Sequence, residues 1–211
     1  MSIQNIRSLA ESAIIVNATP IGMKGFMANE MPLEPKDFRG LNSDTVSNNF
    51  ACFVAYLYIK HIYLLINLSA ICMDNDYMNK TKEEFMKVLE VNLVGMFLVI
   101  KHFSKIMNNN SLIINMSSTD GIDTYNELSI DYSASKAGVI SISKSISLCT
   151  NNKVLCICPN WIDTSSTRSM NKEYLDSELK RINQSRLISL DELVLGFDKI
   201  INSNFNSGDV F

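Results

Sequence analysis

The stretch that decides the fold of this chain is Leu112-Ile-Ile-Asn-Met-Ser-Ser-Thr-Asp-Gly121. Its apolar part predicts a buried strand over 111–116, and this strand ends in hydroxyl groups and a turn glycine. A helix is expected next, over Ile130–Cys149, and a further buried strand over Val154–Cys158. The hydroxyl groups at the end of the first strand therefore lie where a substrate oxygen could be held.

The expected helix carries a phenol and an ammonium group on one face. Tyr132 and Lys136 are four positions apart in Asp131-Tyr-Ser-Ala-Ser-Lys-Ala-Gly138, so their side chains are neighbours on a helix. A phenol with the ordinary pKa of about 10 transfers protons poorly at neutral pH, but a cation beside it favours the phenolate. Lowering the pKa of Tyr132 to near neutrality needs about 4 kcal/mol from Lys136 and a second positive charge. The spacing alone is common on amphipathic helices, so the pair is a candidate acid/base centre only in a wider pattern.

Two polar residues upstream supply that pattern. Asn92 lies inside an apolar helical segment, Val91-Asn-Leu-Val-Gly95, and Ser118 precedes Gly121 by three positions. Each has a structural alternative, because Asn92 fits a satisfied core amide and Ser118 fits a strand end, with Ser117 as a competing candidate. Taken in order, four residues resemble the catalytic tetrad of the short-chain dehydrogenase/reductase family, most closely its 3-oxoacyl-reductase-like members: Asn92, Ser118, Tyr132 and Lys136.

The resemblance extends over about residues 62–211. Asn67 matches the family's Asn-Asn-Ala-Gly motif at a strand end, although Leu68-Ser-Ala70 departs from it. The segment Val154-Leu-Cys-Ile-Cys-Pro-Asn-Trp-Ile-Asp-Thr164 resembles the family's strand and loop that contact the nicotinamide carboxamide, with Asn160 in place of a glycine. The family's glycine-rich turn, Thr-Gly-x-x-x-Gly-x-Gly, holds the cofactor pyrophosphate. None of the eight glycines of this chain forms that turn.

The resemblance implies an α/β fold, a Rossmann-like three-layer sandwich with a mostly parallel sheet that is incomplete at its N-terminal half. It also implies an oxidoreductase that interconverts ketones and alcohols with NAD or NADP, with activity weak or lost because the glycine-rich turn is missing. Tyr132 would transfer the proton and Ser118 would hydrogen-bond the carbonyl oxygen. Lys136 and the cofactor's charge would lower the pKa of the tyrosine, while Asn92 would connect a proton relay. The cofactor-binding residues that it implies are Asn67, Tyr132, Lys136, Pro159, Ile162 and Thr164.

The N-terminal part resembles a different dehydrogenase. Ala13-Ile-Ile-Val-Asn-Ala-Thr-Pro-Ile-Gly-Met-Lys-Gly25 and the segment 31–46 resemble a region near the nicotinamide end of shikimate dehydrogenase, whose catalytic domain has no counterpart here. We therefore expect residues 1–50 to be a shikimate-dehydrogenase-like fragment that need not fold on its own. Residues 51–211 are expected to form a short-chain-dehydrogenase-like domain without the glycine-rich first strand-turn-helix. The alternative function is a non-catalytic remnant or an oligomerising binding module from a truncated or fused gene.

The charge, cysteine content and apolar stretches of the chain argue against several classes of binding partner. A net charge of −3 and a pI of about 5.4 disfavour nucleic-acid binding. The five cysteines favour buried thiols in a reducing compartment, and Cys156-Ile-Cys158 has ordinary strand spacing, so no metal site is expected. Lys60 and His61 interrupt the apolar stretch Phe50–Cys72, and such polar groups are costly inside a membrane. We therefore expect a helix up to Ile59 and a strand from Ile62 to Leu68 rather than a membrane span. We expect a cytoplasmic homo-oligomer that acts on a small carbonyl or alcohol and binds no membrane.

The remaining elements follow from local patterns. A long amphipathic helix is expected over 83–107, with a Thr81/Glu84 capping box, and Asn108–Asn110 is interpreted as the loop that ends it. Ser189 and Glu192 predict a second capping box. The other expected elements are a helix over 3–12, a strand over 13–17, irregular chain over 20–40, and helices over 171–182 and 189–201.

Overall fold

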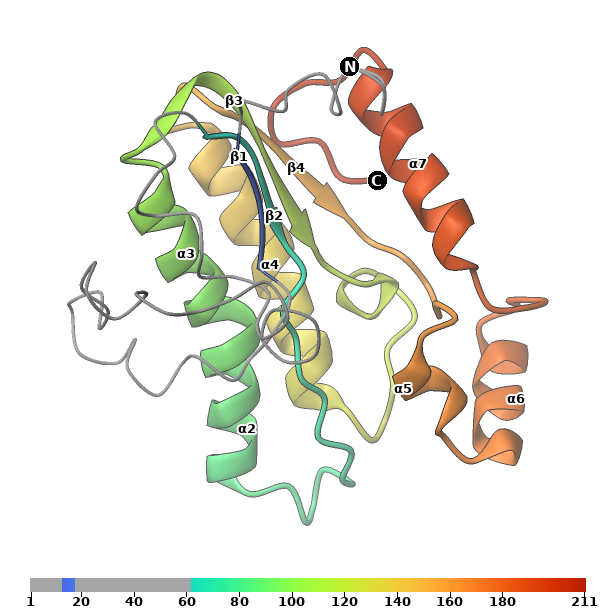
Figure 1. The fold of residues 1–211 in the computed structure, drawn as a ribbon. Helices are drawn as coiled ribbons and strands as arrows, with labels where there is room; N and C mark the ends of the chain where they lie inside the picture. The colour runs from blue at the N-terminus through green and yellow to red at the C-terminus, as the bar shows by residue number, and fades with distance from the viewer. Residues whose placement is uncertain (1–12, 18–61) are drawn as a thin grey trace, which may run out of the picture.

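A parallel sheet forms the centre of the described part of the molecule (Figure 1). The computed structural model describes residues 13–17 and 62–211. The sheet has four strands in these ranges, and their order across the sheet is the same as their order in the chain: β1 (Ala13–Asn17), β2 (Ile62–Asn67), β3 (Met107–Met116) and β4 (Lys153–Ile157). All neighbouring pairs are parallel, so the carboxyl ends of the strands lie at one edge of the sheet. Val210 adds a parallel bridge to Cys156 beyond β4.

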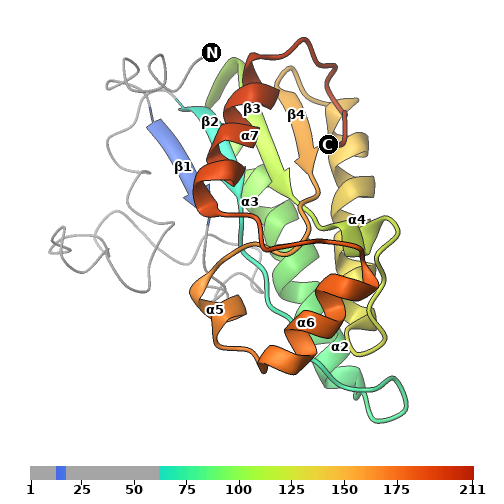
Figure 2. The ribbon, with the colours of Figure 1, turned by 90° about the vertical axis from the view of Figure 1, so that its right-hand side faces the viewer.

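Helices cover both faces of this sheet. On one face α2 (Lys82–Leu89), α3 (Met96–Phe103) and α4 (Ile130–Ser147) lie together, and on the other α7 (Leu190–Asn202) lies across the strands (Figures 1 and 2). The first core contains side chains of α3 and α4 packed on the strands, including Val99, Phe103 and Val139. The second core packs Phe197 and Ile200 of α7 against Ile114. The three layers confirm the predicted α/β, Rossmann-like sandwich.

The long helix expected over 83–107 is interrupted and ends early. After α2, residues Glu90–Gly95 form a π-helical segment, η4, and α3 then ends at Phe103. The Thr81/Glu84 capping box at its start is confirmed. A π turn inserts one extra residue into the helical repeat, and such turns are frequent at functional sites. Here the insertion contains Asn92, the proposed relay residue.

The interpretation of Asn108–Asn110 as a helix-ending loop is wrong, because these residues belong to β3. Met107 already pairs with Ile62, and the register shifts before Leu64. Asn110 has a φ of 63°, a left-handed conformation that asparagine tolerates better than most residues. The three asparagines therefore form an irregular first part of the strand, and the strand is four residues longer than 111–116.

The C-terminal helices match the sequence closely. The helix α6 spans Lys172–Arg181 with Asn171 as its N-cap, and α7 begins with the predicted Ser189/Glu192 capping box. A short helix, α5 (Ser165–Arg168), was not expected. Both α5 and α6 lie beyond the carboxyl end of the sheet (Figure 2).

Of the N-terminal part, only the predicted strand is described. Ala13–Asn17 forms β1 and pairs along β2, so this strand docks on the edge of the same sheet. The helix expected over 3–12, the irregular chain over 20–40 and the helix up to Ile59 lie outside the described residues. Within the described ranges, no helix is long and apolar enough to cross a membrane.

Candidate active site

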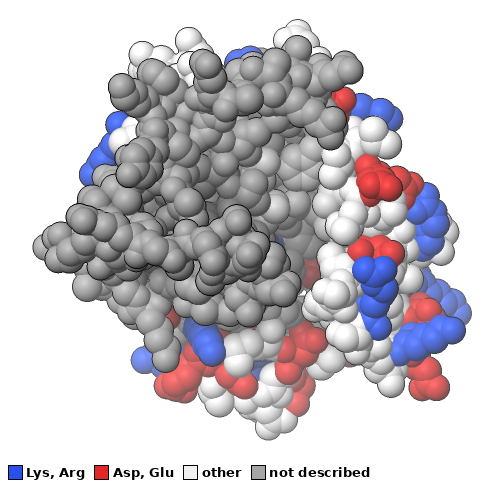
Figure 3. Space-filling view, viewed as in Figure 1, with Lys and Arg blue, Asp and Glu red and all other residues white. Residues whose placement is uncertain are grey.

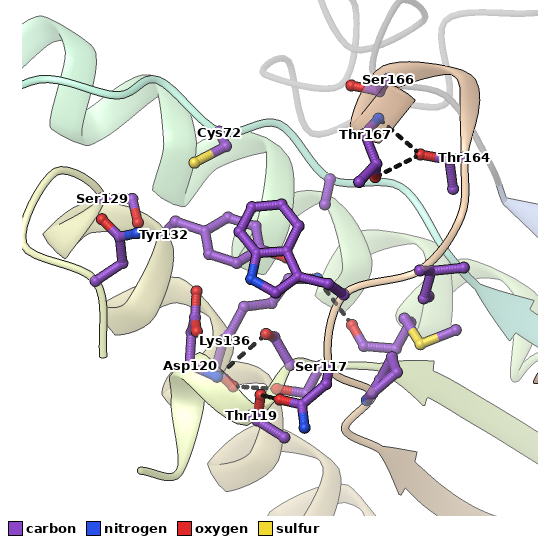
Figure 4. A pocket seen from close by; sticks show the side chains of 18 of the residues that line it. Cys72, Ser117, Thr119, Asp120, Ser129, Tyr132, Lys136, Thr164, Ser166 and Thr167 are labelled. Carbon is purple, nitrogen blue, oxygen red and sulfur yellow. Dashed lines mark hydrogen bonds between the residues drawn. The ribbon is translucent and has the colours of Figure 1, made fainter. Parts of the chain in front are cut away.

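A cavity of about 320 Å³ lies at the carboxyl ends of β2, β3 and β4. The segments that follow these strands form its walls, together with the first turns of α4 and parts of α5 and α6. Four of the predicted site residues with polar side chains line it, namely Ser118, Tyr132, Lys136 and Thr164. Pro159 and Ile162 line it as well. Figure 4 shows Tyr132, Asp120 and Ser129 on one side of this cavity and Thr164, Ser166 and Thr167 on the other.

Ser118 is held so that its hydroxyl proton can be donated. It lies two residues after β3 and is the N-cap of the short 3-10 turn η5 (Thr119–Gly121), where its Oγ accepts a hydrogen bond of 3.1 Å from the Asp120 N–H. The Ser118 hydroxyl lies close enough to the Tyr132 phenol to act on the pKa of the tyrosine, which it lowers. Ser117, the competing candidate, instead donates to the Lys136 carbonyl oxygen at 2.7 Å. The geometry therefore favours Ser118 as the hydroxyl beside the tyrosine.

Gly121 allows this turn to approach the helix. A Cβ atom at this position would lie 2.7 Å from backbone atoms of both Lys136 and Ala137, closer than non-bonded atoms can approach. Only glycine fits without moving the turn away from α4. The Ser-x-x-Gly spacing thus brings Ser118 against the helix that carries Tyr132 and Lys136.

Tyr132 differs from the sequence-based expectation in its acidity. Burial, together with nearby negative groups including Asp120, raises its pKa above the ordinary value, and the Ser118 hydroxyl lowers it in part. The Lys136 ammonium lies 5.4 Å from the centroid of the Tyr132 ring and donates to the Met116 carbonyl oxygen at 2.9 Å. Within the protein itself, burial therefore outweighs the lowering that we expected from the lysine. The tyrosine is a protonated phenol at neutral pH.

Lys136 is almost completely enclosed, with 2% of its surface exposed. Burial lowers its pKa from 10.5 to about 8, partly offset by nearby groups such as the two cysteines of β4 and its following loop. Its charge is thus sensitive to the mildly alkaline pH range.

This shift predicts a pH dependence of stability. Between about pH 8 and about pH 10.5 the unfolded lysine keeps its proton and the folded one loses it, so the free energy of unfolding rises with pH. Relative to a Lys136→Met variant, the unmodified protein should gain about 2 kcal/mol between about pH 7.5 and about pH 9.5. Urea denaturation at these two pH values measures the difference. An equal pH response in both proteins would contradict the lowered pKa.

Asn92 does not line the cavity but anchors its wall. Its amide oxygen accepts from the Ile71 N–H at 2.8 Å, and its amide nitrogen donates to the Ile71 carbonyl at 2.9 Å and to Ser135 Oγ at 3.0 Å. Ser135 in turn donates to the Tyr132 carbonyl at 2.7 Å. The side chain of Asn92 therefore connects the loop after β2 with the first turns of α4.

Asn67 also lies outside the cavity lining. Its amide nitrogen donates to Asn115 Oδ1 at 2.8 Å, and Asn115 donates to Ser143 Oγ at 2.9 Å. These bonds join β2, β3 and α4 at the end of the sheet. Of the residues expected to bind the cofactor, Pro159, Ile162 and Thr164 line the cavity. Asn67 does not line it, and its side chain joins the strands instead.

The loop after β4 forms the opposite wall. Thr164 is the N-cap of α5, its Oγ1 accepting from the Thr167 N–H at 3.1 Å. Ile162 forms a bridge with Ile188, and Gln184 binds the backbone of Trp161 at both N–H and carbonyl. The loop is thus fixed against the segment that follows α6.

Sequence reasoning missed a buried ion pair beside the tyrosine. Lys80 Nζ lies 3.0 Å from Asp131 Oδ2, and the two side chains are 2% and 0% exposed. Lys80 also donates to the Met73 carbonyl, and Asp131 accepts from the Tyr132 N–H at 2.9 Å. The two charges are 51 residues apart in the chain, so no local pattern indicates that they meet.

Asp120 is the other polar residue of the cavity that sequence reasoning missed. It follows Ser118 by two positions, and its side chain accepts a hydrogen bond from Thr124 Oγ1 at 2.8 Å. Its position within the Ser-x-x-Gly motif was the available signal, since the motif places it beside the serine.

Comparison with known proteins places this arrangement in a family. The family model described as enoyl-(acyl carrier protein) reductase matches residues 43–194, which include β2, β3, β4 and the helix of Tyr132 and Lys136. The chain belongs to the short-chain dehydrogenase/reductase family. Among the curated members of this family, the 3-oxoacyl-[acyl-carrier-protein] reductase of Chlamydia trachomatis is 31% identical over 156 residues, which are 72% of this chain and 62% of the relative. Nodulation protein G of Rhizobium sp. is 29% identical over 134 residues, 61% of this chain and 54% of the relative.

Solved structures of short-chain dehydrogenases share the fold. An enzyme of this family from Serratia marcescens superposes with a TM-score of 0.65 at 19% identity, covering 72% of this chain and 64% of that one. A dehydrogenase/reductase from Sinorhizobium meliloti gives a TM-score of 0.64 at 20% identity, covering 71% and 61%. This chain thus spans somewhat more than half the length of these short-chain dehydrogenases and of the two curated relatives.

Proposed function

We propose that the chain binds a nicotinamide cofactor and interconverts a small ketone and its alcohol through Asn92, Ser118, Tyr132 and Lys136. The observation that carries this proposal is the meeting of Ser118, Tyr132 and Lys136 in one cavity at the carboxyl end of a parallel sheet, where α/β proteins bind ligands. The family supports the reaction type. The relatives named 3-oxoacyl-[acyl-carrier-protein] reductases support carbonyl reduction in particular.

The proton chemistry follows from the positions of the side chains. In reduction, the Tyr132 phenol donates its proton to the carbonyl oxygen, and Ser118 donates a hydrogen bond to the same oxygen. The Asp120 N–H occupies a lone pair of Ser118, which leaves the serine proton available for this bond. Because the pKa of Tyr132 is raised, the resting phenol already carries the proton that reduction needs. Alcohol oxidation requires the phenolate, which the positive charge of a bound oxidised cofactor would favour.

The residues present fit the nicotinamide end of a cofactor. The wall formed by Pro159, Ile162 and Thr164 is apolar with one hydroxyl, and Lys136 lines the same cavity. When bound, NAD or NADP supplies or accepts the hydride. In the family, a glycine-rich turn holds the cofactor pyrophosphate. None of the eight glycines of this chain forms such a turn. We therefore propose weak cofactor binding, with activity reduced or lost.

A titration tests cofactor binding directly. Purified full-length chain should enhance NADH or NADPH fluorescence with a dissociation constant on the order of a millimolar, which corresponds to about 4 kcal/mol. Lys136→Ala should weaken this binding further, whereas Lys144→Ala, an exposed lysine of the same helix, should not. Micromolar affinity would contradict weak binding. No binding by either cofactor would favour the alternative, a remnant that serves as an oligomerising or binding module.

The partners proposed are a small-molecule substrate and further copies of this chain, in the cytoplasm. Figure 3 shows acidic and basic side chains interspersed over the described part of one face, which supports a small-molecule partner over a nucleic acid. The division into residues 1–50 and 51–211, with different ancestries, remains part of this proposal.

A further inference from the structure

We propose that the substrate carries an ammonium group and that Asp120 binds this group inside the cavity. The inference rests on the proposed function, because it identifies the substrate class of the same site. Asp120 is partly buried and lies between Ser118, which would hydrogen-bond the reacting oxygen, and Gly121, which fixes the turn. A substrate held by Tyr132 and Ser118 therefore extends past this carboxylate.

The negative charge of Asp120 is not neutralised by a direct partner. Within residues 62–211 it forms no ion pair, and its side chain accepts only the Thr124 hydroxyl. Arg181 lies close enough to lower its pKa, but the guanidinium group is bound to Glu178 at 2.7 Å and to the carbonyl groups of Thr124 and Tyr125. The carboxylate is thus left with open hydrogen-bonding capacity toward the cavity.

Lys136 is a second cation near Asp120. Lys136 also lowers its pKa, but the ammonium group is bound to the Met116 carbonyl at 2.9 Å. Burial is nevertheless the largest effect and, together with Glu178, raises the pKa of Asp120 above its ordinary value, so the carboxylate has already lost part of its water. A ligand that fills the cavity removes more of it.

This loss of water distinguishes three classes of substrate. An apolar chain would desolvate the carboxylate without replacing its hydrogen bonds, which is costly. An anionic substrate would add repulsion from Asp120 and from Asp74, the second acidic residue of the lining. An ammonium group compensates for the lost water with a charge-assisted hydrogen bond. The class differs from the carrier-bound 3-oxoacyl groups that the names of the relatives describe.

The test uses three alcohols of the same shape, each in the trans form with the two ring substituents opposite each other. They are aminocyclohexanol, methylcyclohexanol and hydroxycyclohexanecarboxylate, titrated at neutral pH by ligand-observed NMR. Millimolar NADPH is present throughout, so that no alcohol is oxidised. We expect aminocyclohexanol to bind about tenfold more tightly than methylcyclohexanol, equivalent to about 1.4 kcal/mol, and the carboxylate to bind most weakly.

Two variants and a control locate the preference. Asp120→Asn should reduce the preference for the amine to less than about twofold, and Asp120→Ser serves as the second variant if the asparagine form does not fold. Asp123→Asn removes an exposed carboxylate of the same turn that lies outside the cavity lining, and it should leave the preference unchanged. Equal binding of the three alcohols, or a preference that persists without Asp120, would overturn the inference.

The outcome is separable from that of the proposed function. An amine preference that depends on Asp120, in a protein that reduces no ketone, would support the binding inference and contradict the proposed catalysis. Reduction of neutral ketones by a protein without amine preference would support the catalysis and overturn only the inference.

Discussion

Tyr132→Phe is expected to lower carbonyl reduction at least about a hundredfold, because a positioned general acid contributes on the order of 10²–10⁴ in rate. The substitution removes only the hydroxyl that faces Ser118 and the reacting oxygen, and it keeps the ring that packs near Lys136. Cofactor affinity should therefore change little. Reduction is measured by product formation at millimolar cofactor, since weak binding is expected to keep the rate of the unmodified chain low.

The matched control is Tyr125→Phe. Tyr125 is an exposed tyrosine whose hydroxyl donates to the Ile122 carbonyl, outside the cavity lining. Its replacement should leave reduction unchanged. Activity that persists in Tyr132→Phe would rule out the proposed role of Ser118, Tyr132 and Lys136 as a unit.

The second large effect concerns the ion pair of Lys80 and Asp131. Removing one partner, in Lys80→Met or Asp131→Asn, leaves the other charge buried without its partner, which typically costs 3 kcal/mol or more, so we expect a loss of about that size in the free energy of unfolding. Urea denaturation at neutral pH measures it. Lys82→Met removes an exposed lysine two positions away and should change stability by less than about 0.5 kcal/mol.

The double variant shows whether the two charges act together. With both removed, no unpaired charge stays buried, so the loss should be clearly smaller than the sum of the two single losses. Additive losses would show that the two side chains stabilise the protein independently. The pair joins the loop after β2 to the first turn of α4, so its loss should also move the cavity wall relative to Tyr132.

Features with local causes could be predicted from the sequence. The capping boxes at Thr81 and Ser189 need only residues three positions apart, and both are present. The strand β2 and the start of α4 at Ile130 follow from apolar patterns and lie within a residue of the prediction. The grouping of Ser118, Tyr132 and Lys136 came from the family resemblance rather than from any of these patterns.

Features that depend on distant contacts could not be predicted. The π-helical turn around Asn92 and the early end of α3 depend on how the helix packs on the sheet, which helical periodicity does not encode. The pairing of Met107 with Ile62 extends β3 through Asn108–Asn110, a run that we interpreted as a helix-ending loop. The raised pKa of Tyr132 reflects the burial of its side chain in the folded protein, and the sequence shows only its neighbours along the helix.

The all-parallel sheet has a consequence for how the chain reaches its native state. Adjacent strands cannot be joined by a tight hairpin, and directly bonded residues such as Asn67 and Asn115 are 48 positions apart. Each strand pairing must therefore close a long loop before its hydrogen bonds repay the lost entropy. Chains of this topology fold slowly, and their unpaired strand edges stay exposed to neighbouring molecules in the meantime. Dilute conditions or a chaperone should thus raise the yield of refolded protein.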